Sequence, residues 1–117
     1  EPKYIIGADG TNSTVINCLN IKKKAWIGHV KSFEMSNLNL KYSKYDQLFM
    51  GEFAPRSYAY IFPLSKTTAN IGVGTIFEKE NLDDLFEAFT NVPFIKKQHE
   101  NRKIISTTGW IQGICPR

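Results

Sequence analysis

The pattern of apolar and polar positions at the start of the chain predicts a strand, a turn and a short helix. The apolar run KYIIGADG, residues 3–10, ends on a turn signal and is typical of a strand. The following residues 11–20, TNSTVINCLN, favour a short helix, with Thr11, Asn12 and Ser13 as candidate N-caps.

The middle of the chain alternates with a period of two and predicts four strands. The stretch from residue 27 to residue 40 is the longest of them, and its polarity indicates an edge or solvated position. Three runs rich in aromatic and β-branched residues follow at 46–54, 56–63 and 67–77. Their short separations predict antiparallel hairpins joined in a meander.

The period becomes helical in NLDDLFEAFTNVPF, residues 81–94, where Asn81 is placed to cap an amphipathic helix. Pro93 suits the first turn of a second short helix through residues 94–100. Residues 102–113 then return to strand character. The expected fold class is therefore α+β: an antiparallel sheet of about five strands, with one or two helices on one face.

Composition limits the classes of function. A chain of 117 residues with 42% hydrophobic and 22% charged residues is an ordinary globular chain, and no apolar run reaches the ~18 residues needed to span a bilayer. The net charge of +4 is a mild excess spread along the chain, so no nucleic-acid partner is expected. Cys18 and Cys115 lie far apart without metal-ligand spacing, so we expect no metal site and a reducing, cytoplasmic location.

The first candidate for chemistry is the turn GADG. Gly7 and Gly10 bracket Asp9 where a strand passes into a helix, so that backbone N–H groups can face an anion. Asp9 itself would repel a phosphate, which leaves it to bind a sugar hydroxyl or to hold the turn. A plain turn, whose Asp9 or Thr11 caps the helix, is the commoner use of this spacing.

The second candidate is a row of rings. Tyr58, Tyr60 and Phe62 lie on one side of a strand, because side chains alternate with period two. The next strand has an apolar face made of Ala69, Ile71 and Val73. Its other face is nearly bare and consists of Asn70, Gly72 and Gly74.

The length of the turn decides which face meets the rings. A three-residue turn pairs Tyr60 with Asn70 and Tyr58 with Gly72, which leaves a trough beside an aromatic wall. A two- or four-residue turn pairs the rings with the apolar face, where they pack a core. From the residues alone, core packing is the commoner role of such a stripe.

Two motifs carry a family resemblance. Pro55, Tyr58, Tyr60, Phe62 and Pro63 closely resemble the PxxYxWxFP motif of the geranylgeranyl reductase family of FAD-dependent oxidoreductases, with Tyr60 in place of the Trp. The stretch TTANIGVG is similar to the strand that follows this motif in the family. IIGADGTNSTV resembles the DG motif that the family shares with FAD-dependent hydroxylases. The archaeal digeranylgeranylglycerophospholipid reductase-like members are the nearest type.

The resemblance implies a piece of a split flavoprotein. Residues 1–20 would be a strand-turn-helix fragment of the FAD-binding domain, in which Gly7, Asp9 and Gly10 lie close to the dinucleotide. Residues 21–117 would be an incomplete substrate-binding sheet domain. The family's GxGxxG and GD motifs are outside these residues, so we expect FAD to bind the full-length protein, and this fragment alone neither to retain it nor to be active.

The resemblance also implies a substrate. The protein would reduce carbon–carbon double bonds of isoprenoid chains in lipid precursors, and would associate peripherally with the membrane. The aromatic motif, together with Asn70, Gly72 and Gly74, would line the slot for the prenyl chain; catalytic residues are unassigned. Two alternatives are an FAD-dependent aromatic hydroxylase and a non-catalytic module that binds an apolar ligand or a protein.

Overall fold

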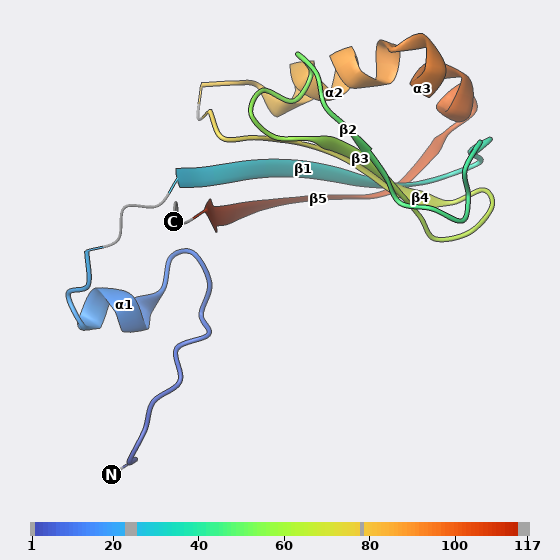
Figure 1. Cartoon of the computed structure of the whole chain (residues 1–117). Coiled ribbons are helices and arrows are strands. Elements are labelled where there is room, and N and C mark those ends of the chain that lie inside the picture. Colours follow the sequence, from blue (N-terminus) through green and yellow to red (C-terminus); the bar gives the residue numbers. More distant parts are fainter. Residues whose placement is uncertain (1, 23–25, 78, 115–117) are drawn as a thin grey trace.

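The described part of the chain folds into a five-stranded sheet with two helices packed on it and a third helix near the N-terminus (Figure 1). The computed structural model describes residues 2–22, 26–77 and 79–114. In chain order the elements are α1 (Thr14–Cys18), β1 (Trp26–Ser36), β2 (Gln47–Phe49), β3 (Ala59–Pro63), β4 (Ala69–Thr75), α2 (Leu82–Asn91), α3 (Pro93–His99) and β5 (Lys103–Ile114).

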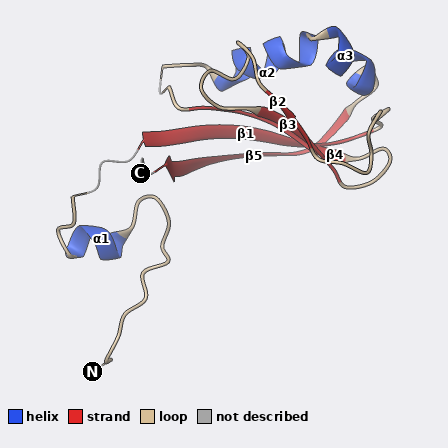
Figure 2. Cartoon of the chain, in the orientation of Figure 1, coloured by secondary structure: helices blue, strands red, loops and turns tan. Residues whose placement is uncertain are grey.

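The sheet has the strand order β2-β3-β4-β1-β5, and every neighbouring pair is antiparallel. Strands β2, β3 and β4 form the expected meander, and α2 and α3 lie together over one face of the sheet (Figure 2). The prediction of an α+β fold with five antiparallel strands and helices on one face is therefore confirmed.

The core lies between this face and the two helices. The rings of Phe33 on β1 and Phe86 on α2 are 4.4 Å apart, and Phe89 sits 5.3 Å from Phe49 and 5.2 Å from Phe53. Helix α2 begins where the Asn81 side chain accepts a hydrogen bond from the backbone N–H of Asp83, as expected. No helix in the described ranges is long and apolar enough to cross a bilayer.

The long strand predicted at 27–40, with an edge or solvated position, differs from strand β1 in its place in the sheet and in its length. Strand β1 lies inside the sheet, between β4 and β5, rather than at an edge. It also ends at Ser36, because Asn37 takes a left-handed backbone with φ of 59° and turns the chain. The polar Ser32 is tolerated inside because it is hydrogen-bonded there.

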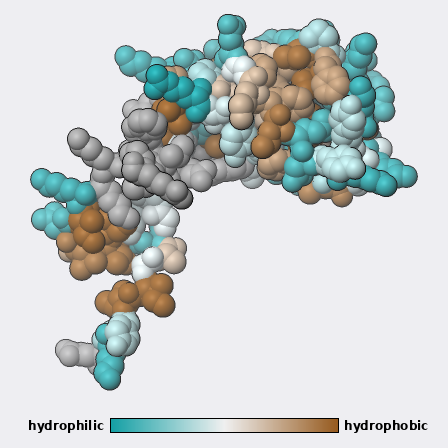
Figure 3. Space-filling view, viewed as in Figure 1, coloured by the Kyte–Doolittle hydropathy of each residue, from teal (hydrophilic) through white to brown (hydrophobic). Residues whose placement is uncertain are grey.

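The strand expected at residues 3–10 does not form. A strand needs a neighbour to satisfy its backbone groups, and none of the described residues pairs with this segment. Its apolar side chains are left outside: Tyr4 is 86% exposed and Ile6 is 91% exposed. Figure 3 shows brown, hydrophobic atoms on the segment near the N-terminus, away from the sheet.

Helix α3 contains a buried histidine, from which we predict that the folded protein loses stability at low pH. His99 is 2% exposed, and its Nδ1 lies 2.7 Å from the carbonyl oxygen of Ile95, so the neutral ring donates there. Burial lowers the pKa of His99 most strongly and Arg102 acts in the same direction, whereas the hydrogen bond to Ile95 and the charge of Glu100 oppose them. The folded protein therefore holds this ring neutral at a pH where the unfolded chain protonates it.

We expect the free energy of unfolding to be highest above the ordinary histidine pKa of about 6.5 and to fall as the pH drops below it, because the unfolded state then binds the additional proton. Urea unfolding at a series of pH values measures this slope. A His99→Gln variant should show a shallower acid slope; an unchanged slope would mean that other groups cause it.

Candidate functional site

The register between β3 and β4 places the rings and the glycines on one face. A five-residue turn joins the strands, so Tyr60 lies opposite Gly72 and Phe62 opposite Asn70. The backbone N–H of Gly74 donates to the carbonyl of Tyr58 at 3.1 Å. We call this side, opposite α2 and α3, the open face of the sheet. It carries Ser32, Tyr60, Phe62, Asn70, Gly72 and Gly74.

The glycines do not leave an empty trough, which corrects the expected slot. A Cβ built on Gly72 would lie 2.4 Å from Cζ of Tyr60, because the phenol ring lies directly over that glycine. A Cβ on Gly74 would lie 2.8 Å from the Ser57 hydroxyl. Each bare position is therefore filled by a neighbouring side chain, and the glycines support a flat aromatic floor rather than an open slot.

The Tyr60 hydroxyl ends in a small polar network. Ser32 on β1 is fully buried; its hydroxyl donates a hydrogen bond to the Asn70 amide oxygen and is also hydrogen-bonded to Tyr60. Burial raises the pKa of the Tyr60 phenol, and the hydrogen bond with Ser32 acts in the opposite direction. The phenol thus stays neutral at physiological pH, and its polar atom is used within the sheet.

The three rings of the motif differ in access. Tyr60 stacks on Phe62 with ring centroids 4.3 Å apart and 22° between planes, and Tyr58 lies 6.2 Å from it at 56°. Tyr60 is only 4% exposed, whereas Tyr58 is 43% exposed and Phe62 is partly exposed. An apolar molecule on the open face would therefore touch Tyr58 and Phe62, with Tyr60 beneath them.

The two prolines of the motif lie beside the rings but not among them. Pro63 is the last residue of β3 and pairs with Ala69, so the alternation puts it on the opposite side from Tyr60. Pro55 lies in the preceding turn, where its carbonyl oxygen accepts a hydrogen bond from the Thr75 hydroxyl at 3.4 Å. Both prolines frame the aromatic strand, and neither is on the open face.

At the GADG turn, Asp9 caps helix α1. Its carboxylate accepts hydrogen bonds from the backbone N–H groups of Thr14 at 2.6 Å and Val15 at 3.1 Å. Ser13 accepts from the N–H of Ile16 at 3.1 Å. A hydrogen bond from the Ser13 side chain, followed by that from Val15, lowers the pKa of the Asp9 carboxyl.

The glycines shape this turn. Gly10 has a φ of 78°, a left-handed backbone that favours glycine. A Cβ on Gly7 would lie 3.1 Å from the Val15 side chain, so a larger residue would push the turn away from the helix.

The contacts at the GADG turn decide whether the described residues could bind the phosphates of FAD. The first N–H groups of α1 are already engaged by Asp9 and Ser13, so the helix start offers no free donors to a phosphate. Figure 1 also draws α1 and the segment before it away from the sheet, so the GADG turn and the aromatic row are not brought together. The described residues alone do not form a site that fits FAD.

Other chemistry is limited in the described ranges. They contain no group of three or more His, Cys, Asp or Glu residues that could hold a metal ion. Cys18 is a free, exposed thiol, and Cys115 lies outside the described residues. The sequence analysis did not identify Ser32. Its role depends on the Tyr60 ring of β3, which is separated from β1 by β4, and no local sequence pattern indicates such a contact.

Two comparisons of the sequence with known proteins agree on one family. The family model described as the geranylgeranyl reductase catalytic domain matches residues 29–111. The chain is 30% identical to a digeranylgeranylglycerophospholipid reductase of Methanococcus aeolicus over 104 residues, which are 86% of this chain and 26% of that protein. It is 38% identical to digeranylgeranylglycerophospholipid reductase 3 of Methanosphaera stadtmanae over 72 residues, 59% of this chain and 18% of that protein.

A solved structure gives the same fold. The chain matches a geranylgeranyl bacteriochlorophyll reductase-like protein from Thermoplasma acidophilum with a TM-score of 0.63 and 22% identity, over 78% of this chain and 23% of that one. The chain thus spans about a quarter or less of the length of these proteins, between 18% and 26%.

The close contact between Tyr60 and Gly72 predicts that the two positions are coupled. Gly72→Ala should lower the free energy of unfolding by about 1–3 kcal/mol, because the added methyl displaces the ring. In a Tyr60→Leu background the same change should cost much less. Urea unfolding of the four proteins measures this coupling energy.

Gly109→Ala on β5 is the matched control, since a Cβ there would meet only the Val30 carbonyl oxygen at an ordinary 3.4 Å. It should be neutral or slightly stabilising, because alanine loses less backbone freedom on folding. Equal costs for Gly72→Ala with and without the Tyr60 ring would show that the ring does not rest on the glycine.

Proposed function

The chain belongs to the geranylgeranyl reductase family, and from this premise we propose that its open face holds an isoprenoid chain whose double bonds the full-length protein reduces. The observation that carries the proposal is that the aromatic floor of Tyr58, Tyr60 and Phe62 lies within the residues matched by the family's catalytic domain. Residues 21–117 would then be part of the substrate domain, and residues 1–20 part of the cofactor domain.

The surface suits such a substrate. An isoprenoid chain is long, thin and apolar, and it gains affinity by burying its surface at about 25 cal/mol per Å². Tyr58 and Phe62 offer accessible rings for that contact, while the Tyr60 hydroxyl is already hydrogen-bonded and presents no unpaired polar group to the chain. The relatives are named for a geranylgeranylated glycerophospholipid, which is a molecule of this class.

The cofactor of the full-length protein is, in this proposal, FAD. When bound, it supplies the hydride for reduction of a carbon–carbon double bond. The residues of this chain bind and orient the isoprenoid and keep water from it. The GADG turn contributes through its shape: Asp9 holds the start of α1 in place, and Gly7 and Gly10 let the backbone turn tightly there.

The first test of the proposal is at Phe62. In the full-length enzyme, Phe62→Ala should lower kcat/KM for a prenyl substrate about tenfold or more, because a partly exposed ring that contacts the chain is lost. Reduction of the bound flavin by dithionite should be unchanged. Phe77→Ala, which removes a 39% exposed ring outside the open face, is the control and should leave both rates as they are. Equal effects of the two substitutions would contradict the assignment of the open face.

A second test separates the two roles of Asp9. Asp9→Ala removes the acceptor for the Thr14 and Val15 N–H groups, so the full-length protein should purify with less flavin. Asp9→Asn keeps an acceptor oxygen and should retain most of the flavin. Flavin absorbance per protein chain measures the occupancy. Full occupancy in Asp9→Ala would show that the turn does not support the cofactor, and equal losses in both variants would assign the role to the charge.

A further inference from the structure

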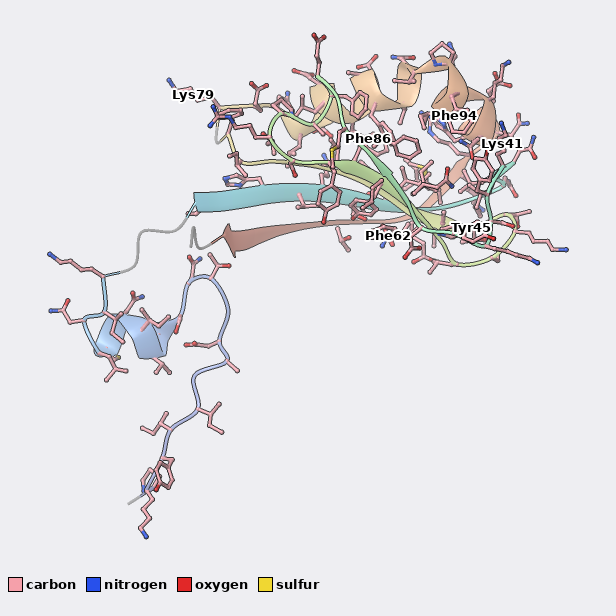
Figure 4. The ribbon with its side chains drawn as sticks, in the orientation of Figure 1. Lys41, Tyr45, Phe62, Lys79, Phe86 and Phe94 are labelled. Carbon is pink, nitrogen blue, oxygen red and sulfur yellow. The ribbon has the colours of Figure 1, made fainter. Side chains whose placement is uncertain are left out.

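One end of the sheet domain combines exposed rings with lysines. The run KYSKY, residues 41–45, leads from β1 toward β2 and lies beside α3. We call this region the basic end; it consists of Lys41, Tyr42, Lys44, Tyr45, Phe94 and Lys97. Figure 4 shows Lys41, Tyr45 and Phe94 gathered at the same end of the molecule, with Lys79 at the opposite end.

The basic end is held in a fixed shape. The backbone N–H of Asn39 donates to the Gln98 carbonyl at 2.8 Å, and that of Lys41 donates to the Gln98 side-chain oxygen at 3.0 Å. Gln98 is itself buried in α3. A groove of about 560 Å³ lies over this junction and is lined by Asn39, Lys41, Pro93, Phe94, Lys97 and Gln98.

The rings and cations of the basic end form one surface. The Lys41 Nζ lies 5.4 Å from the centre of the Tyr42 ring and 5.3 Å from that of Phe94, both within cation–π distance. Tyr45 is 69% exposed and Phe94 is 38% exposed. Rings that combine an apolar body with nearby ammonium groups are suited to the boundary between water and lipid.

The charge of this surface is unbalanced. Among the described residues, the salt bridge joins Lys31 and Asp83. No described carboxylate therefore pairs with a lysine of the basic end. The turn that contains Lys66 is tied to the chain three residues before Lys41, because the backbone N–H of Leu38 donates to the Thr67 carbonyl at 3.0 Å. The acidic neighbours in the sequence are Asp46 and Glu100. The excess of positive charge on this surface favours binding to an anionic partner.

We propose that the basic end docks the full-length protein on a bilayer surface that carries anionic lipid. The lysines attract the lipid headgroups, while the exposed rings enter the headgroup layer. The inference rests on the proposed function in one respect. The row from Tyr58 to Phe62 runs toward the turn at residues 64–68, and Thr67 of this turn is hydrogen-bonded to Leu38, just before the basic end in the chain. A membrane docked there would lie at the end of the aromatic floor, where an isoprenoid chain could pass between them.

Vesicle flotation of the full-length protein tests the docking. Wild type should float with vesicles of equal parts phosphatidylcholine and phosphatidylglycerol, more weakly as salt is raised, and not with phosphatidylcholine alone. Lys41→Glu with Lys97→Glu should lower the partition coefficient at least about 30-fold, since each lysine near an anionic surface is worth about fivefold. Tyr45→Ser should weaken it further without altering net charge.

The matched control is Lys22→Glu with Lys79→Glu, which changes the net charge equally. Lys22 follows α1, which Figure 1 draws away from the sheet, and Figure 4 shows Lys79 far from the basic end. This variant should float like wild type. If both double variants lost flotation equally, net charge alone would explain the binding to vesicles, and the proposal would be overturned. Equal flotation of wild type on neutral and anionic vesicles would also overturn it, as would wild type that binds no vesicles but retains an acidic protein or a nucleic acid.

Turnover separates this inference from the proposed function. Lys41→Glu with Lys97→Glu should reduce a detergent-dispersed prenyl substrate at the wild-type rate, yet lose turnover of substrate embedded in anionic vesicles. If wild type reduces no prenyl substrate in detergent, the proposed function fails, whatever the flotation shows. If the double variant keeps full turnover on vesicles, the docking surface is wrong while the proposed function stands.

Discussion

The open face depends on one ring that crosses a neighbouring strand. Tyr60 starts on β3, lies over Gly72 on β4 and reaches the hydroxyl of Ser32 on β1. Adjacent strands are about 4.8 Å apart, so a side chain can cross one of them only if that strand has no Cβ at the crossing point. The requirement for a bare residue at Gly72 and the requirement for a polar partner at Ser32 therefore arise from the same contact.

This contact also explains why the two faces of the sheet differ. On the helix side, Phe33, Ile71 and Val73 interlock with α2 and form the core. On the open face the Tyr60 ring lies over Gly72 and stacks on Phe62, and the more exposed rings are Tyr58 and Phe62. The buried polar atoms are satisfied by the network of Tyr60, Ser32 and Asn70. The two faces therefore differ in how they are filled: α2 packs on one, and side chains of the sheet itself fill the other.

Local periodicity predicted the five strands of the sheet and the helices, but it left open which face of β4 the rings share, because that depends on the length of the turn. The turn has five residues rather than three, but both lengths are odd, so the rings still meet the glycine side, with partners shifted by two. Features that depend on residues far apart in the sequence could not be predicted from periodicity. The internal place of β1 depends on a polar residue paired across two strands, and the segment at 3–10 requires a strand partner that the described residues do not contain. The direction in which Tyr60 leans is set by packing rather than by spacing.

The tyrosine at position 60 departs from the tryptophan of the family motif, and its position shows how much that matters. The hydroxyl points into the sheet toward Ser32, so it adds no polar group on the side where an apolar chain would lie. Tyrosine and tryptophan are both flat rings with a polar edge that seeks a buried partner. Exchanging one for the other changes the thickness and support of the floor, whereas Tyr58 and Phe62 form the surface that a substrate would touch. In the proposed function, position 60 would therefore act on the fit of the isoprenoid chain through the ring of Phe62, which stacks on it.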